Sequence, residues 1–94
     1  MRIYISGAIT GVDNYKEIFR ETALMLREQG YECVNPAEHD FDLEYWQYMK
    51  IDFLLLDFCD AIYMIPGWEN SKGACYEKVY AEMKNKKVIY GGEE

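Results

Sequence analysis

The chain has 94 residues, which is room for one compact domain (residues 1–94) rather than two. Half of its residues are hydrophobic, while 17 acidic residues against 10 basic ones give a formal net charge of −7. This charge opposes binding to nucleic acid or to an anionic membrane surface. Because so short a domain is marginal alone, we expect a homodimer or larger homo-oligomer, for which nine Tyr and two Trp offer interface material.

The cysteines and the apolar runs indicate a cytoplasmic protein. Cys33, Cys59 and Cys75 are an odd number without paired spacing, so a disulfide framework is disfavoured and reduced thiols are expected. No apolar run approaches the length of a membrane span, and the first residues lack the apolar stretch of a signal peptide.

The pattern of apolar residues over positions 2–30 predicts a strand followed by an amphipathic helix. Arg2–Ser6 is rich in β-branched and aromatic residues and ends at Gly7. Asn14 and Glu17 predict a capping box, and Gly30 is typical of a helix end. Between them, apolar residues recur with helical spacing at Tyr15, Ile18, Phe19, Thr22, Ala23 and Leu26.

The rest of the chain continues the alternation of strand and helix. The pattern predicts strands over 31–34, 61–65 and 88–90, helices over 46–58 and 71–85, polar loops between them and a frayed tail over 91–94. The stripe of the second helix consists of Trp46, Met49, Phe53 and Leu56. Ser71 is a good N-cap for the third helix.

This order predicts an α/β fold, a flavodoxin- or Rossmann-like three-layer sandwich. A four-stranded parallel sheet would have helices on both faces because its crossovers are right-handed. Ligands of such sheets bind beyond the carboxyl ends of the strands. We therefore expect the loops Ser6–Asn14, Asn35–Asp42 and Pro66–Gly73 to line the site.

Several kinds of chemistry are excluded by the residues present. His39 is the single histidine, so a histidine zinc cluster is absent, and its polar surroundings favour a solvated loop residue. The sequence has no GxSxG elbow, P-loop or GxGxxG motif. The glycine turn that begins at Gly7 indicates only that backbone approaches a ligand there.

Among the kinds of catalytic chemistry considered, only catalysis by carboxylate side chains remains. Glu77 lies on a partly apolar stripe of the third predicted helix, and Asp52 borders the apolar stripe of the second. Two half-buried carboxylates at one ligand-binding edge suit glycosidic cleavage, with one as nucleophile and the other as acid/base or sugar anchor. From spacing alone, two ordinary helix carboxylates at a core boundary remain the alternative.

Three stretches resemble the nucleoside 2-deoxyribosyltransferase family, including its deoxynucleoside 5′-monophosphate N-glycosidase branch. Ile3–Gly11 resembles the opening strand and glycine turn. Ile51–Tyr63 resembles the Asp-bearing helix that leads into a hydrophobic strand. Asn70–Glu77, with Ala81 and Lys87–Ile89, resembles the Ser/Gly turn, the nucleophile helix and the last strand, and it is the most specific of the three.

The resemblance implies a role for each matching residue. Glu77 matches the nucleophile that forms a covalent deoxyribosyl intermediate, Asp52 the aspartate that assists at sugar and base, and Tyr4 the positioning tyrosine of the first strand. For Tyr4, a plain core aromatic is an equal alternative. No metal or organic cofactor is implied.

Substrate-binding roles are expected for Gly7, Ser71, Gly73 and Trp68. Ser71 falls where the nucleotide-specific branch has a phosphate-contacting serine, and Gly73 could add a backbone amide, although a plain N-cap explains Ser71 equally well. Trp68 could stack on a base or serve the core or an interface. Thr10 replaces a basic residue of that branch and weakens the case for a 5′-phosphate.

The sequence therefore predicts an enzyme that cleaves or exchanges the N-glycosidic bond of a 2′-deoxyribonucleoside or its 5′-monophosphate. A non-catalytic nucleotide-binding module of the same fold is the alternative, since the fold alone does not decide the function. An interaction domain that uses its aromatic surface is the third possibility.

Overall fold

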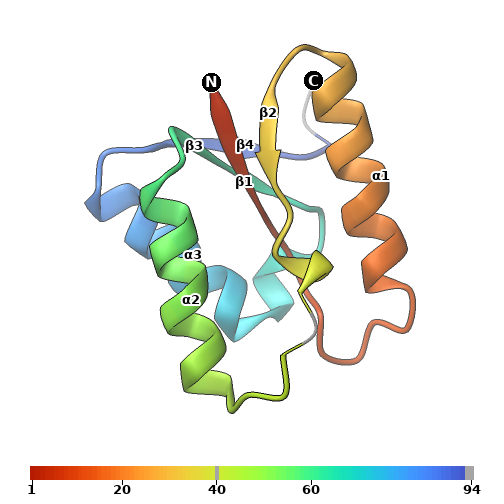
Figure 1. The fold of residues 1–94 in the computed structure, drawn as a ribbon, viewed down its shortest axis with the longest axis vertical. Coiled ribbons are helices and arrows are strands. Elements are labelled where there is room, and N and C mark those ends of the chain that lie inside the picture. The colour runs from red at the N-terminus through yellow and green to blue at the C-terminus, as the bar shows by residue number, and fades with distance from the viewer. Residues whose placement is uncertain (40, 93–94) are drawn as a thin grey trace.

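The computed structural model describes residues 1–39 and 41–92 and contains four parallel strands with helices on both sides (Figure 1). Its elements are β1 (Arg2–Ser6), α1 (Tyr15–Glu28), β2 (Glu32–Val34), α2 (Tyr45–Asp57), β3 (Ala61–Met64), α3 (Lys72–Met83) and β4 (Lys87–Tyr90). The strand order is β2-β1-β3-β4, which confirms the predicted flavodoxin- or Rossmann-like α/β fold.

The sheet has its topological switch point between its two central strands, β1 and β3. Ile3 of β1 lies opposite Cys33 of β2 on one side and Ala61 of β3 on the other. From β1 the chain moves outward to β2, returns to β3 beside β1, and then moves outward to β4. A ligand crevice is therefore expected at the carboxyl ends of β1 and β3.

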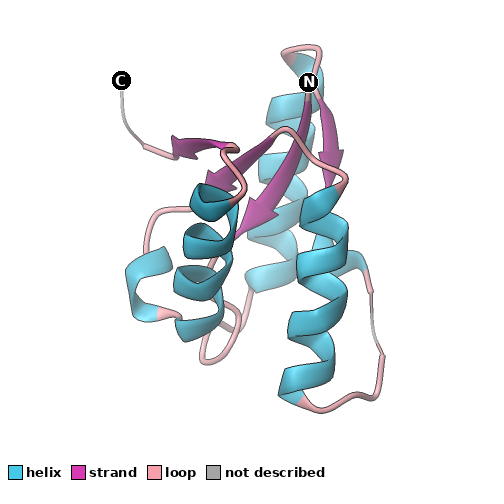
Figure 2. Cartoon of the chain, turned by 90° about the vertical axis from the view of Figure 1, so that its left-hand side faces the viewer, coloured by secondary structure: helices cyan, strands magenta, loops and turns pink. Residues whose placement is uncertain are grey.

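Helix α1 covers one face of the sheet, and α2 and α3 cover the other (Figure 2). On the α1 side, Phe19, Ala23 and Leu26 are buried against Ile3 and Ile5, while Tyr15 and Ile18 pack on the edge of this cluster. These are residues of the predicted apolar face of the first helix, so that prediction is confirmed.

The opposite core cluster combines alternate residues of β1 and β3 with α2 and α3. Tyr4, Ile62 and Met64 are fully buried there, with Leu56 from α2 and Ala81 from α3. Side chains two apart in a strand share a face. Ser6 therefore lies on the same side of β1 as Tyr4, facing α3.

The helix ends agree only in part with the sequence signals. Gly30 has a φ of 94°, a left-handed conformation that glycine adopts without strain, and it follows α1 as predicted. Asn14 precedes α1, but its side chain makes no capping hydrogen bond, so the predicted capping box with Glu17 is wrong. The start of α1 is stabilised by backbone hydrogen bonds, such as the one that Tyr15 N–H donates to the Val12 carbonyl.

Two short 3₁₀ turns, Pro36–Glu38 and Trp68–Asn70, interrupt segments predicted as loops. The first is stabilised by Asn35, whose side-chain oxygen accepts from the backbone N–H of Ala37 at 3.0 Å. The predicted frayed tail falls partly on residues 93–94, which lie outside the described residues. None of the helices in the described ranges is long and apolar enough to cross a membrane.

Candidate active site

The centre of the candidate site is the carboxyl group of Glu77, which lies in the second turn of α3 and is only 6% exposed. The Tyr4 hydroxyl donates to its Oε2 at 2.5 Å, and the Ser6 hydroxyl donates to its Oε1 at 2.7 Å. Both donors come from β1 and are buried. Burying a carboxyl costs free energy unless it is hydrogen-bonded, and here each oxygen has a donor. Glu77 is therefore fixed in orientation.

Burial and a neighbouring acid raise the pKa of Glu77 from 4.5 to about 8. Desolvation is the largest cause, since it disfavours the charged form, and the negative charge of Asp52 acts in the same direction. The hydrogen bonds from Tyr4 and Ser6 act the opposite way because they favour the carboxylate. A pKa this strongly perturbed in a cleft is a mark of a functional site.

Asp52 of α2 faces the same point from across the cleft. Burial raises its pKa as well, although hydrogen bonding with Glu77 and Tyr4 and the charge of His39 lower it. The pKa of Tyr4 is raised well above 10, by burial and then by the charges of Glu77 and Asp52. The structure thus brings together the two carboxylates and the tyrosine that the sequence singles out. This pair of acids can hold a proton between them at neutral pH.

These residues line a cleft of about 630 Å³, within the range typical of small-molecule sites. All three loops expected at the site contribute to it, through Thr10, His39 and Ser71 among others. Tyr45, Tyr48 and Met49 of α2 form an aromatic and apolar wall. The cleft therefore combines a charged floor with an apolar side.

The amino end of α3 opens into the cleft beside Glu77. The Ser71 oxygen accepts from the backbone N–H of Ala74 at 3.2 Å, which makes Ser71 the N-cap of α3 as predicted. Its O–H remains a donor, because capping uses only an oxygen lone pair. Ser71, Lys72 and Gly73 all line the cleft. A cation, a hydroxyl and a helix amino end together suit an anionic group.

Two glycines border the cleft at positions where a side chain would meet a close neighbour. A Cβ at Gly7 would lie 2.9 Å from Cβ of Ile65, so no side chain fits there without a shift of the backbone. A Cβ at Gly73 would lie 3.3 Å from the Tyr45 hydroxyl. Both positions line the cleft, as the sequence predicts.

Trp68, which the sequence offers as a base-stacking residue, is not one of the described residues that line the cleft. Its ring centroid lies 6.0 Å from that of Tyr90 and 5.6 Å from Lys78 Nζ. It packs there against the core cluster of α2 and α3. The core role is the one that the geometry supports.

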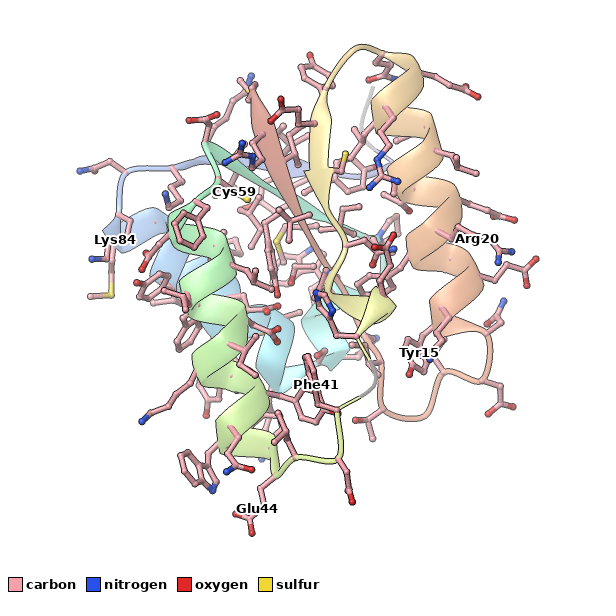
Figure 3. The ribbon with its side chains drawn as sticks, viewed as in Figure 1. Tyr15, Arg20, Phe41, Glu44, Cys59 and Lys84 are labelled. Atoms are coloured by element: carbon pink, nitrogen blue, oxygen red, sulfur yellow. The ribbon has the colours of Figure 1, made fainter. Side chains whose placement is uncertain are left out.

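Other cleft residues were missed by the sequence reasoning. Ser6 was expected only as the start of a loop that lines the site, with no role of its own, yet its hydroxyl holds Glu77. His39 is exposed, as predicted for a loop residue, but it lines the cleft and stacks on Phe41 with ring centroids 5.6 Å apart. In Figure 3, Phe41 lies beside the stretch that leads into α2, and Cys59 lies beyond the other end of that helix. The one available signal was position, since Ser6 ends β1 and His39 lies in the loop that follows β2.

Within the described ranges, no three His, Cys, Asp or Glu side chains are grouped closely enough to hold a metal ion. Cys33, Cys59 and Cys75 are all free thiols.

Solved structures that share this fold include two enzymes. The CMP N-glycosidase BcmB of Clostridium botulinum matches with a TM-score of 0.70 and 26% identity, over 96% of this chain and 67% of that one. A 2-desoxiribosyltransferase from Leishmania mexicana matches with a TM-score of 0.75 and 18% identity, over 95% of this chain and 62% of that one. This chain thus spans about two thirds of the length of either enzyme.

These matches confirm the expected resemblance to the nucleoside 2-deoxyribosyltransferase fold over nearly the whole chain. No curated protein matches the sequence. A family model described as a domain of unknown function, DUF4406, matches residues 1–90. On that match, which spans all four strands and all three helices, the chain belongs to the DUF4406 family.

Proposed function

We propose that this protein cleaves or exchanges the N-glycosidic bond of a nucleoside, preferentially a 2′-deoxyribonucleoside or its 5′-monophosphate. The observation that carries the proposal is the buried Glu77 carboxyl, held at both oxygens by Tyr4 and Ser6 beside Asp52, at the floor of a cleft of nucleoside size. The related structures named as an N-glycosidase and a deoxyribosyltransferase support the same class of reaction.

The reaction follows from the two carboxyl groups. With the proton of the pair on Asp52, an oxygen of ionised Glu77 attacks C1′, the C1′–N bond breaks, and its electron pair leaves with the base, which takes the proton from Asp52. In the second step water attacks C1′ while Asp52 takes back a proton, and Glu77 is released. A second base in place of water gives transfer. Two displacements give net retention at C1′.

The substrate has a natural orientation in the cleft. With C1′ at Glu77, the 5′ group would lie at the amino end of α3, where the hydroxyl of Ser71 and the Lys72 ammonium suit a phosphate. The base would lie against Tyr45 and Tyr48 of the apolar wall. No step of this reaction needs a metal or organic cofactor, and we expect the enzyme to work as a homo-oligomer in the cytoplasm.

The test is a chromatographic assay of base release. The protein is incubated with each nucleoside and nucleoside 5′-monophosphate, in both ribose and deoxyribose forms, with and without a free acceptor base. We expect one subset to release base, and an exchange product only with the acceptor if the enzyme is a transferase. Glu77→Gln should abolish both activities, because the neutral amide cannot attack C1′.

Glu21→Gln is the matched control, since Glu21 is exposed on α1 on the opposite face of the sheet. Its activity should equal that of the wild type. If the wild type releases no base from any substrate yet binds a nucleotide in calorimetry, the glycosidase proposal is wrong and the protein is a binding module. Equal turnover by Glu77→Gln would reject Glu77 as the nucleophile.

A further inference from the structure

No step of the proposed reaction uses the hydroxyl of Ser6, although this side chain lies in the candidate site. Ser6 is the last residue of β1, lines the cleft and is 1% exposed. Its backbone is fixed by the other central strand, since Ser6 lies opposite Met64 of β3 and its carbonyl accepts from Ile65 N–H at 2.8 Å. The hydroxyl is therefore held at a constant place beside Glu77.

The proton of this hydroxyl is committed to Glu77. A serine O–H can donate one hydrogen bond, and that of Ser6 goes to Oε1 of Glu77 at 2.7 Å. Tyr4, two positions earlier on the same face of β1, donates to Oε2. Two donors on two oxygens match a carboxylate, because in a neutral carboxylic acid one oxygen carries the proton and accepts poorly. The donors of β1 therefore favour ionised Glu77.

Burial and a neighbouring charge act against this ionised form. Titratable side chains from β1, α2, α3 and the loop after β2 line the cleft beside Glu77, namely Tyr4, Tyr45, Tyr48, Asp52, Lys72 and His39. Desolvation and then the charge of Asp52 raise the pKa of Glu77. The proposed reaction, however, needs Glu77 ionised and the shared proton on Asp52. The donors on Glu77 therefore have to draw the charge of the pair toward it.

Ser6 and Tyr4 differ in which carboxyl they contact. Hydrogen bonding from Tyr4 lowers the pKa of Asp52 as well as that of Glu77, so this tyrosine favours the ionised form of either acid. The Ser6 hydroxyl donates to Glu77, and within the described ranges no hydrogen bond joins it to Asp52. Since its one proton is used, Ser6 favours a charge on Glu77 over a charge on Asp52.

We propose that Ser6 is a positioning residue that holds the charge of the carboxyl pair on Glu77 and so directs the shared proton to Asp52. The transfer is balanced within the pair, because the proton leaves a Glu77 oxygen and bonds to an Asp52 oxygen while the negative charge moves the opposite way. The consequence for turnover rests on the proposed function. The position of the proton is a property of the free protein, so it is measured without any nucleotide.

The experiment is an NMR titration of the side-chain carboxyl carbons in the free protein, with Glu77 and Asp52 assigned from the signals lost in Glu77→Gln and Asp52→Asn. The two acids titrate as a coupled pair, and their chemical shifts between the two steps report how they share the proton. In Ser6→Ala the ratio of proton on Glu77 to proton on Asp52 should rise about tenfold, because a hydrogen bond to a charged group is lost. Ser6→Cys, which keeps a weak donor of similar size, should lie between Ser6→Ala and the wild type.

Turnover gives a second readout wherever base release is found. Ser6→Ala should lower kcat about tenfold, leave KM within about twofold and move the acid limb of the pH–rate profile to higher pH, because less Glu77 is ionised. Ser6→Cys should recover part of kcat. A packing role alone would not move the acid limb. An acid limb that stays in place despite an altered proton ratio would overturn the positioning role.

Thr22→Val is the matched control, because it removes a hydroxyl that donates to the Ile18 carbonyl on α1, on the other face of the sheet. It should leave both the proton ratio and turnover at wild-type values. The proposal is overturned if Ser6→Ala and Ser6→Cys share the proton as the wild type does, or if Tyr4→Phe changes the ratio as much as Ser6→Ala does. If the ratio changes as expected while the wild type releases no base, the proposed reaction fails and the role of Ser6 in the carboxyl pair stands.

Discussion

Tyr4 and Glu77 are separated by 73 positions in the chain, yet the hydroxyl of one donates to the carboxyl of the other at 2.5 Å. The contact joins the central strand β1 to α3 and is buried. Because α3 follows β3, which pairs with β1, the parallel topology itself brings the two residues together. The hydrogen bond favours the ionised form of Glu77, the form needed for attack on C1′.

Tyr4→Phe should lower kcat about tenfold to a hundredfold while leaving the fold intact. The substitution removes only the oxygen, and a hydrogen bond to a charged group is worth about 1.5–3 kcal/mol. Since that bond lowers the pKa of Glu77, its loss should also move the acid limb of the pH–rate profile to higher pH. Tyr31→Phe, at a more exposed tyrosine, is the control. An unchanged pH profile would contradict a positioning role for Tyr4.

The raised pKa of Glu77 makes stability fall with increasing pH. Between the ordinary value of 4.5 and the folded value of about 8, the native protein holds a proton that the unfolded chain has released. The free energy of unfolding therefore decreases through this interval, by up to about 1.4 kcal/mol per pH unit for a single proton. Below pH 4.5 the contribution is complete. The raised pKa of Asp52 acts in the same direction.

Thermal unfolding of the wild type and of Glu77→Gln, measured between pH 4.5 and about 8, tests whether stability falls with increasing pH. The stability advantage of Glu77→Gln over the wild type should grow with pH, because the amide does not titrate. Glu21→Gln should keep the wild-type slope, since that side chain is exposed on α1. If the difference in unfolding free energy between Glu77→Gln and the wild type stayed constant with pH, the raised pKa would not belong to Glu77.

Local pattern was sufficient for the fold. The apolar spacing of the first helix identified Phe19, Ala23 and Leu26 as its buried face, and the strand–helix alternation gave the parallel sheet with its loops at one edge. The same edge placement brought Glu77 and Asp52 to one cleft. These features depend on periods of two and 3.6 residues, which are written in short windows of sequence.

The features that could not be predicted from the sequence depend on contacts between distant segments of the chain. The bond from Ser6 to Glu77 spans 71 positions, and nothing in a strand sequence indicates which polar residue meets a helix. Trp46 fits an apolar stripe, but whether a neighbour covers that stripe is a tertiary matter, and 54% of Trp46 is exposed. Asn14 has the right residue type for a cap, yet backbone bonds at the start of α1 make the cap dispensable.

Gly73→Ala should narrow the cleft without destabilising the protein. Alanine is the better helix former, and the one tight contact of its Cβ would be the Tyr45 hydroxyl, the far end of a half-exposed side chain that can move. Moving Tyr45 shifts the α2 wall, so nucleotide affinity should fall about tenfold. Calorimetric titration measures this, and Tyr45→Phe should restore most of the loss by removing the crowded oxygen. If Gly73→Ala lowered nucleotide affinity equally in the presence and in the absence of Tyr45→Phe, Tyr45 would not be involved.

Ser71→Asp separates the two roles of Ser71, as N-cap of α3 and as partner of a 5′-phosphate. Aspartate is as good an N-cap as serine, so its oxygen can still accept from Ala74 N–H and thermal stability should change little. Its negative charge, however, would stand where a phosphate binds. We expect kcat/KM for 5′-monophosphates to fall tenfold or more, while kcat/KM for free nucleosides stays within about twofold.

Ser71→Ala completes this comparison, because it removes the cap and the hydroxyl donor together. It should cost about 1 kcal/mol of stability and weaken monophosphate turnover less than Ser71→Asp, since no repulsion is added. Monophosphate turnover should decrease from the wild type to Ser71→Ala and further to Ser71→Asp, while stability should follow a different order. That result would assign the phosphate to the amino end of α3. Parallel losses for nucleosides and monophosphates would instead leave Ser71 as a cap alone, and the 5′ group would have to lie elsewhere in the cleft.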